Sequence, residues 1–430
     1  MLLAILVYSI LLFYLTWKNF RFGVGFFILL LPAYLMRFSW FGLPTTLLEV
    51  NLGILILVWL IKFAKDDWNE LKSIVKQRLV FFIFAVIFLL AALGAVFVSG
   101  IGMKDFWSEV LSALGIWRAY FLEPIILFFV LAVSARKQRL SINDIVWFLL
   151  LSGAIVAILA IIQKFFGIWY PPSLWKADFL GKRATSFFTS PNALGMYLAP
   201  LFVLATAMVW QKIKNALEQN ISIKIIIKNN LLLAILALLF IVAILFSNSQ
   251  GACAAVVIAG IVIIYLCGIR RTAIVLALLS MSAALYFAPL RQAVFFADTA
   301  GQNRVQLWHY SIDYLVKNPQ NFVLGTGLRQ FLDKIQKPVN DFTKIEPLLY
   351  PHNFILNFWT EIGLFGMLAF LVMLGYLFFN AVKIYKNNKI LGAGLIGLLL
   401  VWVVQGLVDV PYFKNDLSIM WWLYVLVLLF

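Results

Sequence analysis

Charged residues are scarce in this chain, and so are cysteine and histidine. Aspartate, glutamate, lysine and arginine make up 12% of the 430 residues, whereas a soluble domain has about a quarter. Hydrophobic residues make up 64%, so we expect a lipid bilayer to be the main solvent of the folded chain. The net charge of +16 therefore indicates membrane topology and no binding to nucleic acid, because most basic residues flank apolar segments.

The few cysteines and histidines exclude several kinds of site. Cys253 and Cys267 lie inside apolar segments and predict neither a disulfide framework nor a metal cluster. No CxxC or HExxH spacing occurs, and the phosphate-binding pattern GxxxxGK(S/T) is also missing. We therefore expect no metal, no ATP site of that kind and no cofactor.

Long apolar runs are what the sequence does contain. Runs of about 16 to 25 residues can cross the roughly 30 Å hydrocarbon layer. They predict an all-α integral membrane protein, a polytopic bundle of about 12 to 13 transmembrane helices, since no alternating barrel segments occur. The predicted spans are 2–17, 22–36, 44–62, 79–99, 116–134, 144–166, 190–210, 230–247, 251–268, 272–288, 353–380, 391–408 and 415–430.

One long polar interval interrupts these runs and divides a single domain into three regions. They are an N-terminal transmembrane bundle (1–288), a long loop carrying short helices (289–350) and C-terminal transmembrane helices (351–430). Within the loop, 303–318 predicts an amphipathic helix that ends at Asn318-Pro319. Its predicted apolar stripe consists of Val305, Trp308, Ile312 and Leu315, and Arg304 lies one turn before Trp308.

The short connections alternate between rich and poor in lysine and arginine. Connections near 18–21, 62–78, 136–139, 212–228, 270–271 and 383–389 are rich, so the positive-inside rule predicts that they are cytoplasmic. Thirteen spans then place the N-terminus outside and the C-terminus inside. The 289–350 loop and the connection 167–189 are predicted to be extracytoplasmic.

Several basic residues stand on the outer side against this bias. They are Arg118, Lys182, Arg183, Arg291, Arg304 and Arg329. Each is compatible with a salt bridge or with a side chain that reaches lipid phosphates. Several arginines on one face also favour an anion site, because a guanidinium binds two oxygens and stays charged.

His352 follows Pro351 at the outer start of a predicted span. The positive end of that helix dipole favours a neutral imidazole, which can accept a proton. A histidine bonded to a carbonyl at the membrane interface is the other interpretation. Glu361 lies about 180° round the same helix, so we expect it to be a poor partner for His352, although a carboxylate inside a span is itself a candidate site residue. Glu361 and Asp409 are the alternatives if His352 has no catalytic role.

Six short segments carry a resemblance to a known family. They include Arg183-Ala-Thr-Ser-Phe-Phe-Thr-Ser-Pro-Asn192 and Ser247-Asn-Ser-Gln-Gly-Ala252. The others are Asn303-Arg304-Val-Gln-Leu-Trp308, Gly325-Thr-Gly327, Pro351-His352-Asn353 and Glu361-Ile-Gly-Leu-Phe-Gly366. Together they resemble the O-antigen ligase and O-antigen polymerase superfamily, most strongly over about residues 180–370. Gln250 departs from the family, which often has arginine there, and the thirteenth helix departs from the usual twelve.

The resemblance implies a GT-C-like glycosyltransferase of the inner (plasma) membrane. It would transfer a glycan from undecaprenyl pyrophosphate to an acceptor hydroxyl on the extracytoplasmic side, without metal or cofactor, and invert the anomeric centre. Arg183 and Arg304 are similar to the arginines that engage the donor pyrophosphate, and His352 to the histidine proposed to activate the acceptor. Arg118, Lys182, Asn192, Trp308, Asn353 and Glu361 are possible supporting residues.

Two alternatives stay open at this point. A polymerase would add the glycan to another lipid-linked glycan, and a ligase would add it to lipid A-core or protein; the sequence does not separate them. A transporter of lipid-linked glycans has a similar number of spans, but it predicts inverted repeats and ionisable groups near the midplane of the membrane.

Overall fold

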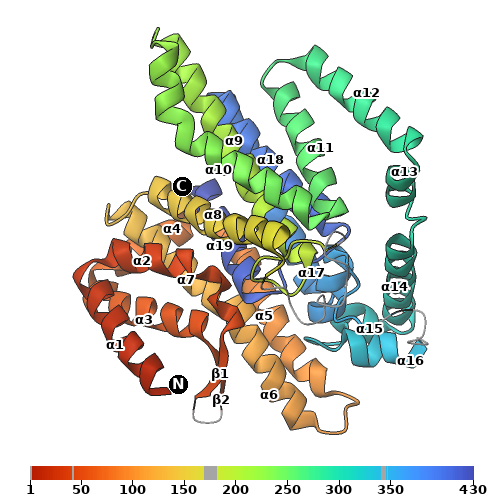
Figure 1. Cartoon of the computed structure of the whole chain (residues 1–430). Coiled ribbons are helices and arrows are strands. Elements are labelled where there is room, and N and C mark those ends of the chain that lie inside the picture. The colour runs from red at the N-terminus through yellow and green to blue at the C-terminus, as the bar shows by residue number, and fades with distance from the viewer. Residues whose placement is uncertain (1, 41–42, 169–181, 340–344, 346) are drawn as a thin grey trace.

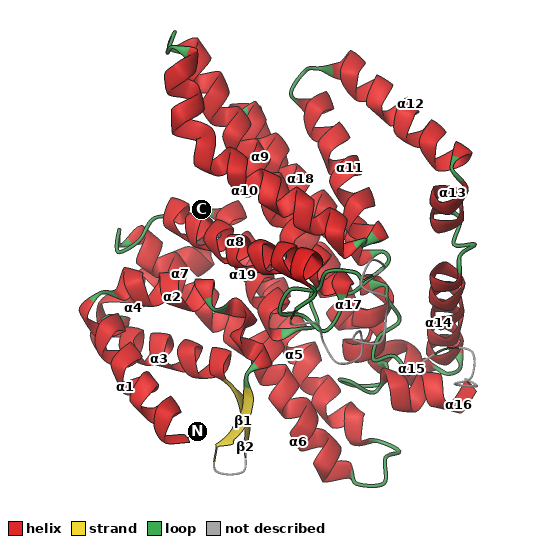
Figure 2. Cartoon of the chain, viewed as in Figure 1, coloured by secondary structure: helices red, strands yellow, loops and turns green. Residues whose placement is uncertain are grey.

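The computed structural model is a bundle of α-helices with one small β-hairpin (Figures 1 and 2). It describes residues 2–40, 43–168, 182–339, 345 and 347–430. The expected all-α polytopic membrane fold is confirmed. In the described part, seven helices are long and apolar enough to cross a membrane, or nine if each of two bent helix pairs is one span. Four shorter apolar helices accompany them.

The main helices follow the apolar runs, because a backbone in lipid must satisfy its hydrogen bonds within the segment. They are α1 (Leu2–Lys18), α2 (Phe20–Leu29), α3 (Leu47–Lys62), α4 (Ala64–Gln77), α5 (Leu79–Gly100), α6 (Phe106–Trp117), α7 (Glu123–Arg136), α8 (Ile142–Phe166), α9 (Pro191–Glu218), α10 (Ile223–Ser247), α11 (Gln250–Leu266), α12 (Arg270–Tyr286), α17 (Phe354–Asn387), α18 (Lys389–Gly406) and α19 (Asn415–Leu429).

The predicted span 22–36 is wrong as a single helix. α2 ends at Leu29, and the 3₁₀ turn that follows (Leu31–Leu35) has Pro32 as its second residue, whose ring nitrogen has no hydrogen to continue the helix. An antiparallel hairpin of β1 (Arg37–Trp40) and β2 (Leu43–Thr46) follows. The span predicted to begin at residue 44 therefore begins at Leu47, where Thr46 and Glu49 form a capping box.

The predicted connection 100–115 is also mostly helical. Asp105 caps α6, and α6 continues into α7 through a π-helical turn (Arg118–Leu122), so 106–136 is one long helical segment. Pro124 at the start of α7 lacks an N–H, which is a usual cause of such a turn. The Tyr120 carbonyl, four residues before Pro124, instead accepts a hydrogen bond from the Tyr412 hydroxyl at 2.8 Å.

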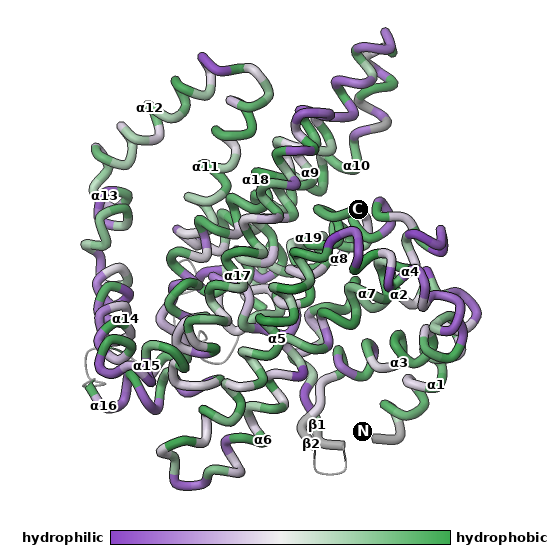
Figure 3. The backbone as a smooth tube through the Cα atoms, turned by 180° about the vertical axis from the view of Figure 1, so that it is seen from behind, coloured by the Kyte–Doolittle hydropathy of each residue, from purple (hydrophilic) through white to green (hydrophobic). Residues whose placement is uncertain are grey.

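The polar interval consists of short helices that turn away from α12 by a bend of 100°. They are α13 (Ala288–Val294), α14 (Thr299–Val316), α15 (Pro319–Leu324), the π-helical turn η5 (Phe331–Gln336) and α16 (Lys337–Val339). The amphipathic helix is present as α14, and the hydrophilic residues along it in Figure 3 contrast with the mostly apolar α12.

The apolar stripe predicted for α14 is rotated in the structure. Its buried face consists of Leu307, Ser311 and Leu315 together with Gly301, whereas Ile312 is 45% exposed. Leu307 is part of a small apolar cluster with Phe331, Ile335 and Ile345. This local cluster helps to orient α14, which packs on α15, η5 and α17.

Contacts between connections divide the bundle into two faces. On one face, ion pairs join the basic connections near residues 21, 67–70 and 136–144: Arg21–Asp144, Arg136–Glu70 and Arg139–Asp67. On the other face, Arg118 in the π-helical turn after α6 pairs with Glu49 of α3, and Gln330 just before η5 binds Glu109 of α6. His352 and Asp409 form the third contact on this face. The candidate residues lie on the second face.

Two glycines allow the loop after α15 to lie directly against two spans. Gly325 has φ +69° and Gly327 has φ +89°. A Cβ atom at Gly325 would be 2.3 Å from the Thr360 carbonyl of α17, and one at Gly327 would be 2.3 Å from the Ser99 nitrogen of α5. Any larger residue would therefore push the loop off α5 and α17.

Candidate functional site

His352 lies immediately before α17 and is oriented by the cap of that helix. Asn353 is the N-cap, and its Oδ1 accepts hydrogen bonds from the N–H groups of Ile355 and Leu356. Its Nδ2 donates to the Leu407 carbonyl at 3.1 Å, which joins this segment to the loop between α18 and α19. His352 itself has φ +52°, an uncommon conformation for a residue other than glycine.

Asp409 from that loop is the partner of the His352 ring. The distance between His352 Nδ1 and Asp409 Oδ1 is 3.2 Å, and Asp409 is buried. Burial raises the pKa of the Asp409 carboxyl, but the His352 ring, the Val410 N–H and Lys414 outweigh it, so the pKa lies below its usual value. An ionised Asp409 holds a proton on Nδ1 and leaves Nε2 free to accept another.

Trp308 connects α14 to the histidine segment. Its indole Nε1–H donates to the Pro351 carbonyl at 2.9 Å, and its ring packs edge-on against Phe296. Arg304 is one helical turn before Trp308 and is partly buried. In the described residues, no carboxylate forms an ion pair with Arg304.

Arg183 is held by a short loop that α8 fixes in place. Gln163 of α8 accepts hydrogen bonds from the N–H groups of Thr185 and Ser186 through its Oε1. The guanidinium of Arg183 donates to the Ser247 carbonyl at 2.8 Å and to Asn192 Oδ1 at 3.0 Å. Both acceptors are neutral, so these contacts position the guanidinium without cancelling its charge.

Arg183 and Arg304 are close enough to affect one another electrostatically. Burial, and then the positive charge of Arg304, lower the pKa of the Arg183 guanidinium. Two arginines from distant parts of the chain, with no carboxylate paired to either in the described ranges, form a site suited to an anion with several oxygens.

The other sequence candidates have different surroundings. Arg118 forms ion pairs with Glu49 at 2.9 Å and Glu123 at 3.1 Å, so its charge is balanced within the bundle. The carbonyl of Lys182 accepts a hydrogen bond from Lys164. Glu361 is 1% exposed and accepts from the Arg329 backbone N–H at 2.5 Å, with no contact to His352.

The sequence does not indicate that Asp409 and His352 form a pair. The residues are 57 positions apart, and the sequence indicates Asp409 only as an alternative catalytic group. A possible signal was its position, since it is an acidic residue directly after an apolar run, on the side predicted to be extracytoplasmic.

Comparison with known proteins gives one family match, over about a third of the chain. The family model of the O-antigen ligases matches residues 235–371, which include Arg304, Trp308 and His352 but not Arg183 or Asp409. A comparison with curated proteins finds no match.

Proposed function

Because residues 235–371 match the family model of the O-antigen ligases, we propose that the chain is an inverting, metal-independent glycosyltransferase of the inner membrane. Its donor is a glycan on undecaprenyl pyrophosphate, and its acceptor is a hydroxyl of a lipid or glycan on the extracytoplasmic side. The observation that carries this proposal is the proximity of Arg183 and Arg304, which have no carboxylate partner in the described residues, on the same face as the Asp409–His352 pair.

The arginines act on the leaving group. A glycosyl pyrophosphate is already activated, so transfer requires stabilisation of the negative charge that develops on the departing pyrophosphate. Arg183 and Arg304 supply paired N–H donors for that charge. Trp308 fixes α14, and thus Arg304, relative to the segment that carries His352.

His352 acts on the acceptor. Its Nε2 takes the hydroxyl proton as the acceptor oxygen attacks the anomeric carbon and the bond to the pyrophosphate breaks. Asp409 keeps the proton on Nδ1 and stabilises the imidazolium that forms, as the carboxylate does in a catalytic triad. Direct displacement inverts the anomeric centre and requires no carboxylate nucleophile.

Transfer in detergent from purified lipid-linked glycan, with a chelator and no nucleotide, tests this function. We expect glycan to appear on the acceptor and free undecaprenyl pyrophosphate to be released. Product from lipid A-core would indicate a ligase, and a ladder of lengths on lipid-linked glycan would indicate a polymerase. Unmodified glycan accumulating on the opposite side of proteoliposomes, with no new linkage, would contradict the proposal and support transport.

Asp409→Asn should lower turnover by roughly 10²–10⁴-fold. An asparagine amide can donate to Nδ1, which moves the ring proton to Nε2 and removes the lone pair that accepts from the hydroxyl. The measurement is kcat with saturating donor, together with donor affinity, which should not change. Asp409→Glu keeps a carboxylate and should retain more activity than Asp409→Asn; equal activity of both variants and the wild type would exclude this role.

The face that carries the site should be extracytoplasmic, along with the N-terminus. The lysines and arginines of the opposite face favour the cytoplasm. In a chain without Cys253 and Cys267, an impermeant thiol reagent should label Gln302→Cys in intact cells, since Gln302 is exposed on α14. Lys65→Cys, exposed on α4, should react only after lysis. The reverse pattern would mean that the topology is inverted.

A further inference from the structure

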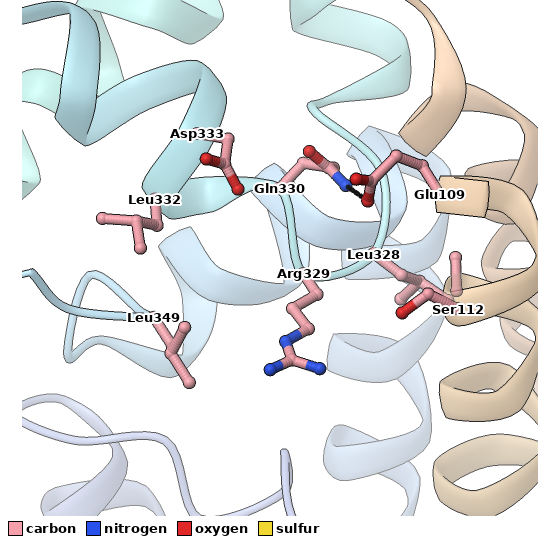
Figure 4. A pocket seen from close by; sticks show the side chains of 9 residues that line it. Glu109, Ser112, Leu328, Arg329, Gln330, Leu332, Asp333 and Leu349 are labelled. Atoms are coloured by element: carbon pink, nitrogen blue, oxygen red, sulfur yellow. Dashed lines mark hydrogen bonds between the residues drawn. The ribbon is translucent and has the colours of Figure 1, made fainter. Parts of the chain in front are cut away.

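A small polar cavity lies between α6 and the loop that follows Gly327 (Figure 4). Its volume is about 250 Å³. Polar side chains from two segments more than two hundred residues apart form much of its wall, and Leu349 closes one side. The polar lining residues are Glu109, Ser112, Arg329, Gln330 and Asp333.

Gln330 leaves a hydrogen-bonding atom without a partner in this wall. Its side chain is 2% exposed, and its Nε2 donates to Glu109 Oε2 at 2.9 Å. Its Oε1 is buried and accepts no hydrogen bond from the described residues. A buried carbonyl without a donor is unfavourable, so it favours a ligand that brings a hydroxyl or N–H group.

Arg329 has both a strained backbone and a free guanidinium. Its φ is +62°, a conformation held in place by the hydrogen bond from its N–H to the buried Glu361 carboxylate. Figure 4 shows the guanidinium extending into the open space between Leu349 and Ser112. Among the described residues, its side chain has no hydrogen bond or ion pair.

The combination of groups fits a sugar. Carboxylates and the free Gln330 carbonyl accept hydrogen bonds from hydroxyls, and the guanidinium and the Ser112 hydroxyl donate to ring and hydroxyl oxygens. Asp333 forms an ion pair with Lys337, which leaves the Glu109 carboxylate beside the Arg329 guanidinium, so the wall is close to neutral and fits an uncharged sugar better than a second pyrophosphate.

The position of the cavity indicates which sugar it holds. Leu349 is three residues before His352, so their Cα atoms are at most about 11 Å apart. The segment that joins Leu349 to His352 also contacts α14, because the Pro351 carbonyl accepts a hydrogen bond from Trp308. Arg304 lies on α14 one turn before Trp308. We propose, on the basis of the proposed function, that the cavity binds a sugar residue of the acceptor and holds its reactive hydroxyl at His352.

Acceptor kinetics of three purified variants test this proposal. With saturating donor and either deacylated core oligosaccharide or lipid-linked glycan as acceptor, Arg329→Gln and Gln330→Leu should each raise the acceptor KM about 10- to 100-fold. Donor affinity should stay unchanged. Arg291→Gln removes an exposed arginine of α13 and is the matched control, with an unchanged acceptor KM. Arg329→Gln changes an exposed side chain, so it tests the cavity even if Gln330→Leu does not fold.

The outcomes separate this inference from the function on which it rests. Normal transfer by the wild type, with an unchanged acceptor KM in Arg329→Gln and in any folded Gln330→Leu protein, would overturn the acceptor site alone. A loss of donor affinity in Arg329→Gln would also overturn it, because it would assign the arginine to the donor. No transfer by the wild type with either acceptor would overturn the proposed function and the acceptor site with it.

Discussion

Replacing His352 with alanine should lower the turnover of glycan transfer by about 10²–10⁴-fold and leave donor binding unchanged. General-base catalysis contributes about this much, because the attacking hydroxyl loses its proton as the new bond forms. Arg183 and Arg304 do not contact the ring of His352 in the described structure, so the affinity for the lipid pyrophosphate should persist. The measurement is kcat with saturating donor and acceptor, beside the donor dissociation constant.

His309→Ala is the matched control within the same chain. His309 is exposed on α14 beside Phe295 and Phe296, and in the described residues the Asp409 carboxylate pairs with His352 instead. We expect its turnover to be near that of the wild type. A His352→Ala protein with near-normal turnover would assign activation of the acceptor to another group, and Glu361 would be the next residue to test.

Replacing Arg183 or Arg304 with alanine should weaken donor binding about 10- to 100-fold each, with a further loss of turnover. Hydrogen bonds to charged groups contribute about 1.5–3 kcal/mol apiece, and the leaving pyrophosphate gains charge in the transition state. The measurement is donor affinity together with kcat/KM at low and high salt. Lysine variants should also be impaired, because an ammonium cannot bind two oxygens as a guanidinium does.

Arg291→Ala is the control for net charge on this face, since Arg291 is exposed on α13. Arg183 also contacts Ser247 and Asn192, so the melting temperature of each variant should be compared with that of the wild type. Normal transfer by both folded alanine variants, Arg183→Ala and Arg304→Ala, would contradict the donor site.

Much of the transmembrane architecture follows from the sequence, because a helix needs a long run of apolar residues to cross the bilayer. The runs that became α5, α8 and α17 were predictable from hydropathy alone. The hairpin after α2 and the helical 106–117 segment were not predictable in this way, since short elements need no long apolar run. Proline and helix-capping residues determine those elements, and their effects are local.

The site was only partly predictable for a similar reason. Arg183 and Arg304 were candidates because they are basic residues on the side where the positive-inside rule predicts few. His352 was a candidate because it follows Pro351 at the start of a predicted span. The partner of His352 depends on how the loop after α18 packs against the start of α17, which involves residues 57 apart. The orientation of α14 likewise depends on Leu307 packing against Phe331, a contact that helical periodicity alone does not specify.

The proposed reaction is a single displacement at the anomeric carbon, with the pyrophosphate on Arg183 and Arg304 and the acceptor activated by His352. The most direct test is the anomeric configuration of the new linkage, measured by NMR on product formed by the purified protein from a donor of known configuration. We expect inversion relative to the donor. Retention would require a covalent glycosyl intermediate on a protein nucleophile and would contradict a single displacement.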